Sequence, residues 1–284
     1  MALIHELLER APSFSFEFFP PKNDEEQARL EQTIRDLEPL RPSFVSVTYR
    51  GGRISRERTT AVVMDLQRTT SITPMPHLTC VCHTRAELEE IVSTFTAAGL
   101  PNLLALGGDP VPGEPPGELA YASELVELAR RVGSRSIGVA AHPAGHPRST
   151  SLVEDRDRLA AKLERADFAI TQFFFERDEY LRLVDDLARR GVHKPVVPGI
   201  MPVTSLSSIS RMAELSGYRV PDHVVAALEP LESDPAALRR AGIEMAGELC
   251  RQLLDVGAPG LHFYTLNRST ATREIYRSLG LTAA

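Results

Sequence analysis

The chain has 284 residues, of which 43% are hydrophobic and 25% charged, and its formal net charge is −6. This is the composition of an ordinary globular protein, long enough to bury a core without disulfides or metal. The negative balance disfavours nucleic acid and anionic membranes as partners. Cys80, Cys82 and Cys250 form neither a redox pair nor a zinc framework, and no segment resembles a signal peptide or a membrane span. We therefore expect a cytoplasmic protein.

Strand-like and helix-like segments alternate along the chain. After an amphipathic N-terminal helix, short runs rich in β-branched and aromatic residues predict eight strands, at Ser13–Phe18, Phe44–Tyr49, Met75–Cys80, Asn102–Leu106, Ser136–Ala141, Phe168–Phe173, Pro195–Pro198 and Leu261–Thr265. Patterns with charged faces predict helices between and after them, at Asp24–Leu37, Arg56–Thr69, Arg85–Ala98, Leu119–Val132, Leu152–Arg165, Arg177–Arg190, Ser205–Leu215, Asp234–Val256 and Thr270–Leu279.

This alternation predicts an α/β architecture. Strands that alternate with helices pair in parallel through right-handed crossovers. Eight such units in a chain of this length are typical of a (β/α)8 TIM barrel, here with extra helices before the last strand. We expect one catalytic domain over residues 1–284, and a doubly wound sheet is the alternative.

Polar residues gather where the predicted strands end, which is where barrel enzymes carry their active sites. The first strand ends with Glu17 among phenylalanines, a costly place for an unpaired carboxylate. The other strand ends contribute further polar or glycine residues: Thr48, His77, Gly107, Gly108, Asp109, His142, His146, Gln172, Tyr264, Asn267 and Arg268.

Each candidate also has a purely structural explanation. Glu17 could belong to an ion pair, although we favour a functional role, and Asp109 could cap the following helix. His77 and Gln172 could equally satisfy hydrogen bonds inside the barrel. His142 and His146 lack a clear carboxylate partner, so we expect no metal site.

Seven sequence blocks, in order, resemble the bacterial methylenetetrahydrofolate reductase family over nearly the whole chain. The blocks are SFEFFPPK (Ser15–Lys22), FVSVTY (Phe44–Tyr49), PHLTC (Pro76–Cys80), LALGGDP (Leu104–Pro110), AITQFFF (Ala169–Phe175), PGIMPV (Pro198–Val203) and HFYTLNR (His262–Arg268). The resemblance implies reduction of 5,10-methylenetetrahydrofolate to 5-methyltetrahydrofolate with electrons from NADH or NADPH, relayed in the family by FAD.

The resemblance also assigns roles to individual residues. Glu17 matches the general acid that opens the methylene bridge, and Asp109 matches the acid beside flavin and pterin. Gln172, Thr48, Arg268 and Met212 match substrate-side positions. Flavin contacts match Thr48, His77, Gly108, Asp109, Tyr121, Ala122, His142, His146, Asp155 and Lys162. A carboxyl group surrounded by Phe16, Phe18 and Phe19 is expected to have a raised pKa and to hold its proton near neutrality.

Several cofactor positions depart from the family pattern. Gly107 stands where an arginine is common, and His142 where a tyrosine is common. Arg158 and Ala161 stand where an asparagine and an arginine face the flavin phosphates, although Arg158 could compensate in part. Each lost charge-assisted hydrogen bond is worth about 1.5–3 kcal/mol, or more than about tenfold in affinity. Ser208 and Met212 replace a glutamine and a phenylalanine on the folate side.

Two hydride routes therefore stay open: through FAD, or directly from NAD(P)H to the folate, which the departures favour. An alternative from another functional class is a catalytically inactive folate-binding barrel that acts as a regulator. The retained Glu17, Asp109 and Gln172 argue against it. A different flavin barrel enzyme, such as a proline dehydrogenase, does not fit the ordered blocks. The sequence does not decide between NADH and NADPH, the polyglutamate tail of the folate, or whether the chain forms a homo-oligomer.

Overall fold

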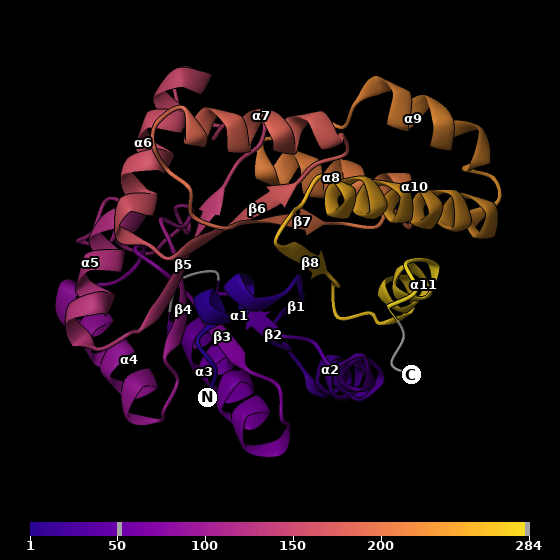
Figure 1. Cartoon of the computed structure of the whole chain (residues 1–284). Coiled ribbons are helices and arrows are strands. Elements are labelled where there is room, and N and C mark those ends of the chain that lie inside the picture. The colour runs from indigo at the N-terminus through magenta and orange to yellow at the C-terminus, as the bar shows by residue number, and fades with distance from the viewer. Residues whose placement is uncertain (50–52, 282–284) are drawn as a thin grey trace.

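The computed structural model describes residues 1–49 and 53–281, and its strands close into one parallel barrel in the order β1 to β8. The strands are β1 (Ser13–Phe18), β2 (Phe44–Val47), β3 (Pro74–Thr79), β4 (Asn102–Leu106), β5 (Ser136–Ala141), β6 (Phe168–Phe173), β7 (Val196–Ile200) and β8 (Gly260–Tyr264). β1 pairs with both β2 and β8, which closes the barrel. The predicted TIM barrel is confirmed, and Figure 1 shows the helices arranged around the strands.

The helices lie where the charged-face patterns predicted them, with ends that differ by a few residues. They are α1 (Ile4–Arg10), α2 (Asp24–Leu37), α3 (Arg53–Thr69), α4 (Arg85–Ala97), α5 (Ala122–Val132), α6 (Leu152–Arg165), α7 (Arg177–Ala188), α8 (Leu206–Ser216), α9 (Asp222–Leu228), α10 (Pro235–Asp255) and α11 (Thr270–Ser278), with 3-10 turns at Glu38–Leu40 and Glu229–Leu231. Side-chain caps fix several starts: Thr84 and Glu87 form a reciprocal capping box at α4. The prediction missed α9, which is only 7 residues long.

The extra helices before the last strand are also confirmed. Three helices, α8, α9 and α10, lie between β7 and β8. They gather on one side of the barrel, with α9 in orange at the outer edge in Figure 1. Met201, Val203, Ile209, Val224 and Leu228 form a separate apolar cluster there, so the insertion has its own small core. This core holds α8 beside the carboxyl ends of β6 and β7.

Side chains inside the barrel change character from one end to the other. Near the amino ends of the strands the interior is apolar, with Phe44, Met75, Leu104 and Phe168 packed against Ile4 of α1. Helix α1 therefore plugs this end. Polar side chains point inward nearer the carboxyl ends, where Ser15, Ser46 and Glu17 contact one another's partners inside the barrel. An interior filled by layers of large apolar residues is usual for this fold.

The carboxyl-end opening, which we call the barrel mouth, is therefore the polar end of an otherwise apolar barrel. Parallel strands bring all eight carboxyl ends to this opening. Within the part of the chain that the structure describes, no helix is long and apolar enough to cross a membrane.

Candidate active site

Glu17 is the buried centre of a polar cluster just inside the barrel mouth. Its side chain extends inward from β1, and the residue is only 7% exposed. Its Oε2 atom lies 3.3 Å from Ser46 Oγ, 3.4 Å from His262 Nε2 and 3.5 Å from His77 Nε2. The register pairs Glu17 with Ser46 on one side and with Tyr264 on the other. Three neighbouring strands thus converge on one carboxylate.

The phenylalanines near Glu17 in the sequence do not surround it in space. Phe16 and Phe18 belong to the outer core between the barrel and its helices, because neighbouring side chains along a strand point to opposite faces. The expected raised pKa is wrong. Burial alone raises the pKa of Glu17, but His77, His262 and the Ser46 hydroxyl together lower it below its ordinary value.

His77 is buried, and burial lowers the pKa of its imidazole to about 4 despite the opposing effect of Glu17. It is therefore neutral near pH 7. Among the described residues its Nε2 has no hydrogen-bond partner, and neither do the buried Thr48 Oγ1 and Thr79 Oγ1. Buried polar atoms are nearly always satisfied, so unpaired ones at a barrel mouth indicate a ligand or ordered water. Thr48 directly follows β2, and His77 and Thr79 lie on β3, at the carboxyl ends of these two strands.

The loop after β4 brings Gly107, Gly108 and Asp109 to the mouth. Gly108 has a φ of +82°, and a Cβ there would lie 2.6 Å from Val81 Cγ2. A glycine is therefore needed for the loop to pack against β3. Asp109 is exposed at the end of this turn. Arg148, from the loop after β5, donates from Nη2 to the Gly108 carbonyl at 3.2 Å and approaches the side of Gly107.

The loop after β5 contains two neutral histidines. His142 and His146 meet edge to face, with ring centroids 4.6 Å apart. Burial lowers the pKa of His142 to about 3, with the charges of His146, Lys162, Arg156 and Arg148 adding to the effect, and burial also lowers that of His146. Asp155 caps the loop by accepting from the His146 amide at 3.0 Å. Arg156, fully buried, donates to the His142 and Pro143 carbonyls at 2.9 and 2.6 Å, which braces the loop.

At the positions of α6 that are expected near a cofactor phosphate, the basic side chains bind other groups of the protein or are absent. Lys162 Nζ donates to the Ala140 carbonyl at 2.6 Å, and burial lowers its pKa to about 8. Arg158 pairs with Glu154 one turn away at 2.6 Å, on an exposed helix surface. Ala161 is exposed and has no charge to offer. This arrangement does not support the expectation that Arg158 partly compensates for the arginine that is missing at the flavin phosphates.

Gln172 lies beside an irregularity of the sheet. The pairing of β6 with β7 shifts register between Ile170 and Phe173, and such bulges often re-aim a side chain next to an active site. Tyr264 donates from its hydroxyl to the Thr171 carbonyl at 2.6 Å, and Thr171 Oγ1 accepts from the Gly199 amide at 2.9 Å. Within the described residues, the Gln172 amide has no hydrogen-bond partner. The bulge therefore presents an unpaired amide at the mouth.

The remaining predicted residues are spread around the mouth. Tyr121 and Ala122 begin α5, where Glu124 accepts from the Tyr121 amide at 2.9 Å, and the Tyr121 side chain is 61% exposed. Arg268 is exposed in the loop after β8. Met212 and Ser208 lie on α8, and Met212 packs on the small core of the inserted helices. The direct contacts thus unite Glu17 with His77, and His142 with His146 and Asp155, whereas the other candidates lie on separate elements around the mouth.

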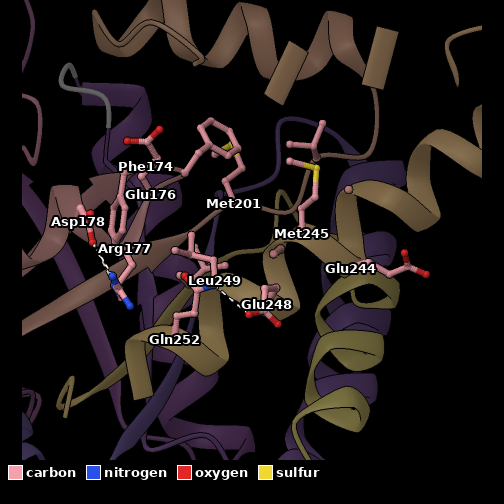
Figure 2. A pocket seen from close by; sticks show the side chains of 15 residues that line it. Phe174, Glu176, Arg177, Asp178, Met201, Glu244, Met245, Glu248, Leu249 and Gln252 are labelled. Carbon is pink, nitrogen blue, oxygen red and sulfur yellow. Dashed lines mark hydrogen bonds and ion pairs between the residues drawn. The ribbon is translucent and has the colours of Figure 1, made fainter. Parts of the chain in front are cut away.

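A second hollow lies outside the barrel wall, between the start of α7 and the middle of α10. Figure 2 shows Glu176 and Asp178 on one side of it and Glu244 and Glu248 on the other. Arg177 lines it too but pairs with Asp178 at 2.9 Å. None of the residues predicted for the active site lines this groove. Its four carboxylates do not suit an anionic folate or dinucleotide, so the barrel mouth is the better candidate site.

Comparison with known proteins identifies the family. Residues 3–280 match the family model described as methylenetetrahydrofolate reductase. The chain belongs to the methylenetetrahydrofolate reductase family. It is 36% identical to the 5,10-methylenetetrahydrofolate reductase of Pectobacterium carotovorum subsp. carotovorum over 268 residues, which cover 94% of this chain and 90% of that protein. It is 35% identical to the Escherichia coli (strain K12) enzyme over the same shares of the two chains.

Longer methylenetetrahydrofolate reductases also match. Methylenetetrahydrofolate reductase 1 of Schizosaccharomyces pombe is 34% identical over 98% of this chain but only 48% of its own length. Among solved structures, an uncharacterized protein from Clostridium thermocellum that binds two copies of 5-methyl-5,6,7,8-tetrahydrofolic acid has a TM-score of 0.68 over 99% of this chain and 98% of that one. At 16% identity that likeness shows the barrel fold alone.

The methylenetetrahydrofolate reductase family makes this chain an oxidoreductase of one-carbon metabolism, and its relatives support reduction of the folate to the methyl form. The family generally uses FAD and NAD(P)H. The mouth fits the ring of such a group, because Thr48, Thr79 and His77 leave buried polar atoms unpaired. The α6 region does not fit tight binding of the FAD pyrophosphate, because Lys162 is held by a carbonyl and Arg158 by a carboxylate.

Sequence reasoning missed the residues that hold Glu17. Ser15, Ser46 and His262 all lie within the blocks that resemble the family, but the resemblance assigns none of them a role. The available signal was parity: His262 precedes Tyr264 by two positions on β8, so both point to the same side of the sheet. Which polar side chain meets which depends on the register between β8 and β1, and no single strand encodes that register.

Proposed function

We propose that this enzyme reduces 5,10-methylenetetrahydrofolate to 5-methyltetrahydrofolate at the barrel mouth, with Glu17 as general acid and NAD(P)H as hydride donor. The observation that carries the proposal is the buried Glu17 carboxyl just inside this opening, contacted by Ser46, His77 and His262. The unpaired Thr48 and Thr79 hydroxyls beside it support a polar ring as the ligand. Membership of the family supports the reaction itself.

The chemistry needs one proton and one hydride. Glu17 gives its proton to the departing nitrogen of the methylene bridge as the carbon–nitrogen bond breaks, which leaves an iminium cation on the other nitrogen. The hydride of NAD(P)H then adds to the methylene carbon, giving the methyl group and the oxidised nicotinamide. A solvent proton restores the acid. The carboxylate of Asp109, on the loop after β4, stabilises the cationic iminium electrostatically.

Glu17 must gain its proton when folate binds, because its partners lower its pKa in the ligand-free site. A pterin lying across the mouth removes the remaining water from the carboxyl, and desolvation favours the neutral acid. Folate binding and protonation of Glu17 are therefore coupled in this proposal.

The other residues bind and orient the substrates. The Gln172 amide can donate and accept at once, which suits the pterin edge. Thr48 supplies a hydroxyl to the same ring, and the exposed guanidinium of Arg268 suits the folate carboxylates. Met212 offers an adaptable apolar surface at the start of the inserted helices, where the folate and the nicotinamide would both pass.

We further propose that hydride passes directly from NAD(P)H to the folate. The support is the surface of α6. Arg158 and Lys162 are engaged by other groups and Ala161 carries no charge, so these three positions offer no unpaired cation to a permanently held FAD pyrophosphate. A dinucleotide that binds and leaves as a substrate, such as NAD(P)H, needs a weaker binding site than a permanently held FAD does. No step is assigned to flavin.

Two measurements test the proposal. The purified protein is expected to show no flavin absorbance in the visible range and to oxidise NADH with methylenetetrahydrofolate when no FAD is added. Stoichiometric bound flavin, or a strict need for it, would overturn the direct route. Glu17→Gln is expected to lower kcat by about 10²–10⁴-fold. The same substitution at Glu25, whose side chain is 82% exposed on α2, is the control and should leave the rate unchanged.

A further inference from the structure

The two oxygens of the Glu17 carboxyl have different surroundings. The three closest polar contacts all go to Oε2: Ser46 Oγ at 3.3 Å, His262 Nε2 at 3.4 Å and His77 Nε2 at 3.5 Å. Within the described residues, Oε1 has no hydrogen-bond partner. The carboxyl is thus held by one oxygen, and the other is left for the reactant.

His262 is itself held from its far side. Its Nδ1 lies 2.8 Å from Ser15 Oγ, and this hydroxyl is also 3.4 Å from the Leu261 carbonyl. The imidazole stacks on Phe44 with centroids 5.8 Å apart and an interplanar angle of 16°, and Tyr264 meets it edge-on at 5.5 Å. Ser15 and His262 are fully buried. The ring therefore has a fixed orientation, with Nε2 directed at Glu17.

One arrangement of hydrogens serves both protonation states of Glu17. Ser15 donates to Nδ1 of His262, and the Nε2–H of that ring donates to Glu17 Oε2. The Ser46 hydroxyl donates to Oε2 as well. Because Oε2 stays an acceptor whether the carboxyl is ionised or neutral, a proton taken up by Glu17 sits on Oε1, the oxygen from which it is given away.

We propose that Ser15 and His262 are positioning residues that hold Glu17 Oε2 in both protonation states, so that Oε1 faces the methylene bridge throughout the cycle. This inference rests on the proposed function of Glu17 and adds two residues to it. His262 touches neither substrate in this account and acts through Glu17. A functional group that must deliver a proton to one atom benefits from buried hydrogen-bond partners that fix its orientation.

The test compares Ser15→Ala and His262→Phe with a matched control. His262→Phe keeps a flat ring against Phe44, and Ser15→Ala removes one hydroxyl. Ser13→Ala is the control, since Ser13 lies two residues earlier on the inward face of β1 and its buried hydroxyl has no hydrogen-bond partner among the described residues. Steady-state rates are measured against pH, and thermal unfolding shows whether each variant folds.

Ser15→Ala is expected to lower kcat roughly tenfold, with little change in KM for the folate, because a misplaced acid slows chemistry more than binding. His262→Phe removes a group that lowers the pKa of Glu17, so the alkaline limb of kcat/KM should move to higher pH. Ser13→Ala should match the parent protein in both respects.

The outcomes separate the two claims. If Glu17→Gln is inactive but both variants keep the parent rate and pH profile, the positioning role is wrong. If Glu17→Gln keeps its activity, the proposed function itself fails. If His262→Phe does not fold, Ser15→Ala decides alone: an unchanged kcat overturns the inference, and a lowered kcat at unchanged KM supports it.

Discussion

Gly199→Ala should damage both the fold and folate binding, because no room exists for a methyl group on β7. A Cβ at this position would lie 2.3 Å from the Thr171 carbonyl oxygen and 2.6 Å from the Tyr264 ring. The oxygen belongs to a strand and already accepts from the Tyr264 hydroxyl at 2.6 Å, so neither neighbour can move cheaply. Overpacking of this kind costs about 1–3 kcal/mol.

The loss of stability can be measured as a fall in Tm, and the damage to folate binding as a rise in KM. For a chain of this size the cost corresponds to a Tm lower by roughly 2–12 °C. The same displacement moves the bulge that presents Gln172, so KM for the folate should rise. Differential scanning calorimetry and steady-state kinetics measure the two effects.

Gly247→Ala on α10 is the matched control. Its Cβ would lie 3.1 Å from the Ser278 hydroxyl, the end of a side chain that can rotate, and alanine favours a helix by about 1 kcal/mol over glycine. It should be neutral or stabilising. A Gly199→Ala protein with the parent's Tm and folate KM would refute the idea that Tyr264, Thr171 and Gly199 lock the bulge.

Three further predictions follow from buried groups at the mouth. Thr48→Val should leave the ligand-free protein as stable as the parent, since its hydroxyl is unpaired, yet raise a substrate KM by about 3- to 10-fold; an unchanged KM would remove Thr48 from the site. Because the pKa of His77 is lowered to about 4 in the folded protein, the unfolded chain binds more protons than the folded protein between about pH 4 and 6.5. The resulting stability, about 3 kcal/mol, is complete above that window and is lost as pH falls through it. Denaturant titrations should show a flatter dependence in His77→Gln, and an equally steep one would contradict the assignment. Folate binding should take up about one proton at Glu17, measured by calorimetry in buffers of different ionisation enthalpy, and the uptake should vanish in Glu17→Gln.

Much of the barrel could be predicted because its signals are local. Each strand of about five residues alternates with an amphipathic helix, and the capping residues mark where several helices start. The inserted α9 was missed because its 7 residues, DHVVAAL, span fewer than two clear turns of pattern. Its place is fixed instead by packing of Val224 and Leu228 into the small core of the insertion.

Which polar residues end the strands could be predicted, but the electrostatics of Glu17 could not. Side chains alternate along a strand, and the Glu17 side chain points inward from β1 to meet Ser46 and His262. The same alternation puts Phe16 and Phe18 on the outward face. The expectation of an apolar environment for Glu17 therefore treated neighbours in sequence as neighbours in space. The lowered pKa of Glu17 comes from His77 and His262, which reach it through strand register over 60 and 245 residues of chain. No local pattern reports such pairs.

The origin of the hydrogen in the product methyl group tests the central claim most directly. The protein, without added flavin, is mixed with methylenetetrahydrofolate and NADH that carries deuterium at the transferred position of C4, and the product is analysed by mass spectrometry. Direct transfer predicts one deuterium retained in the methyl group, because the hydride never meets water. A methyl group that carries solvent hydrogen instead would show that an exchangeable carrier lies between the nicotinamide and the folate, and would contradict the account.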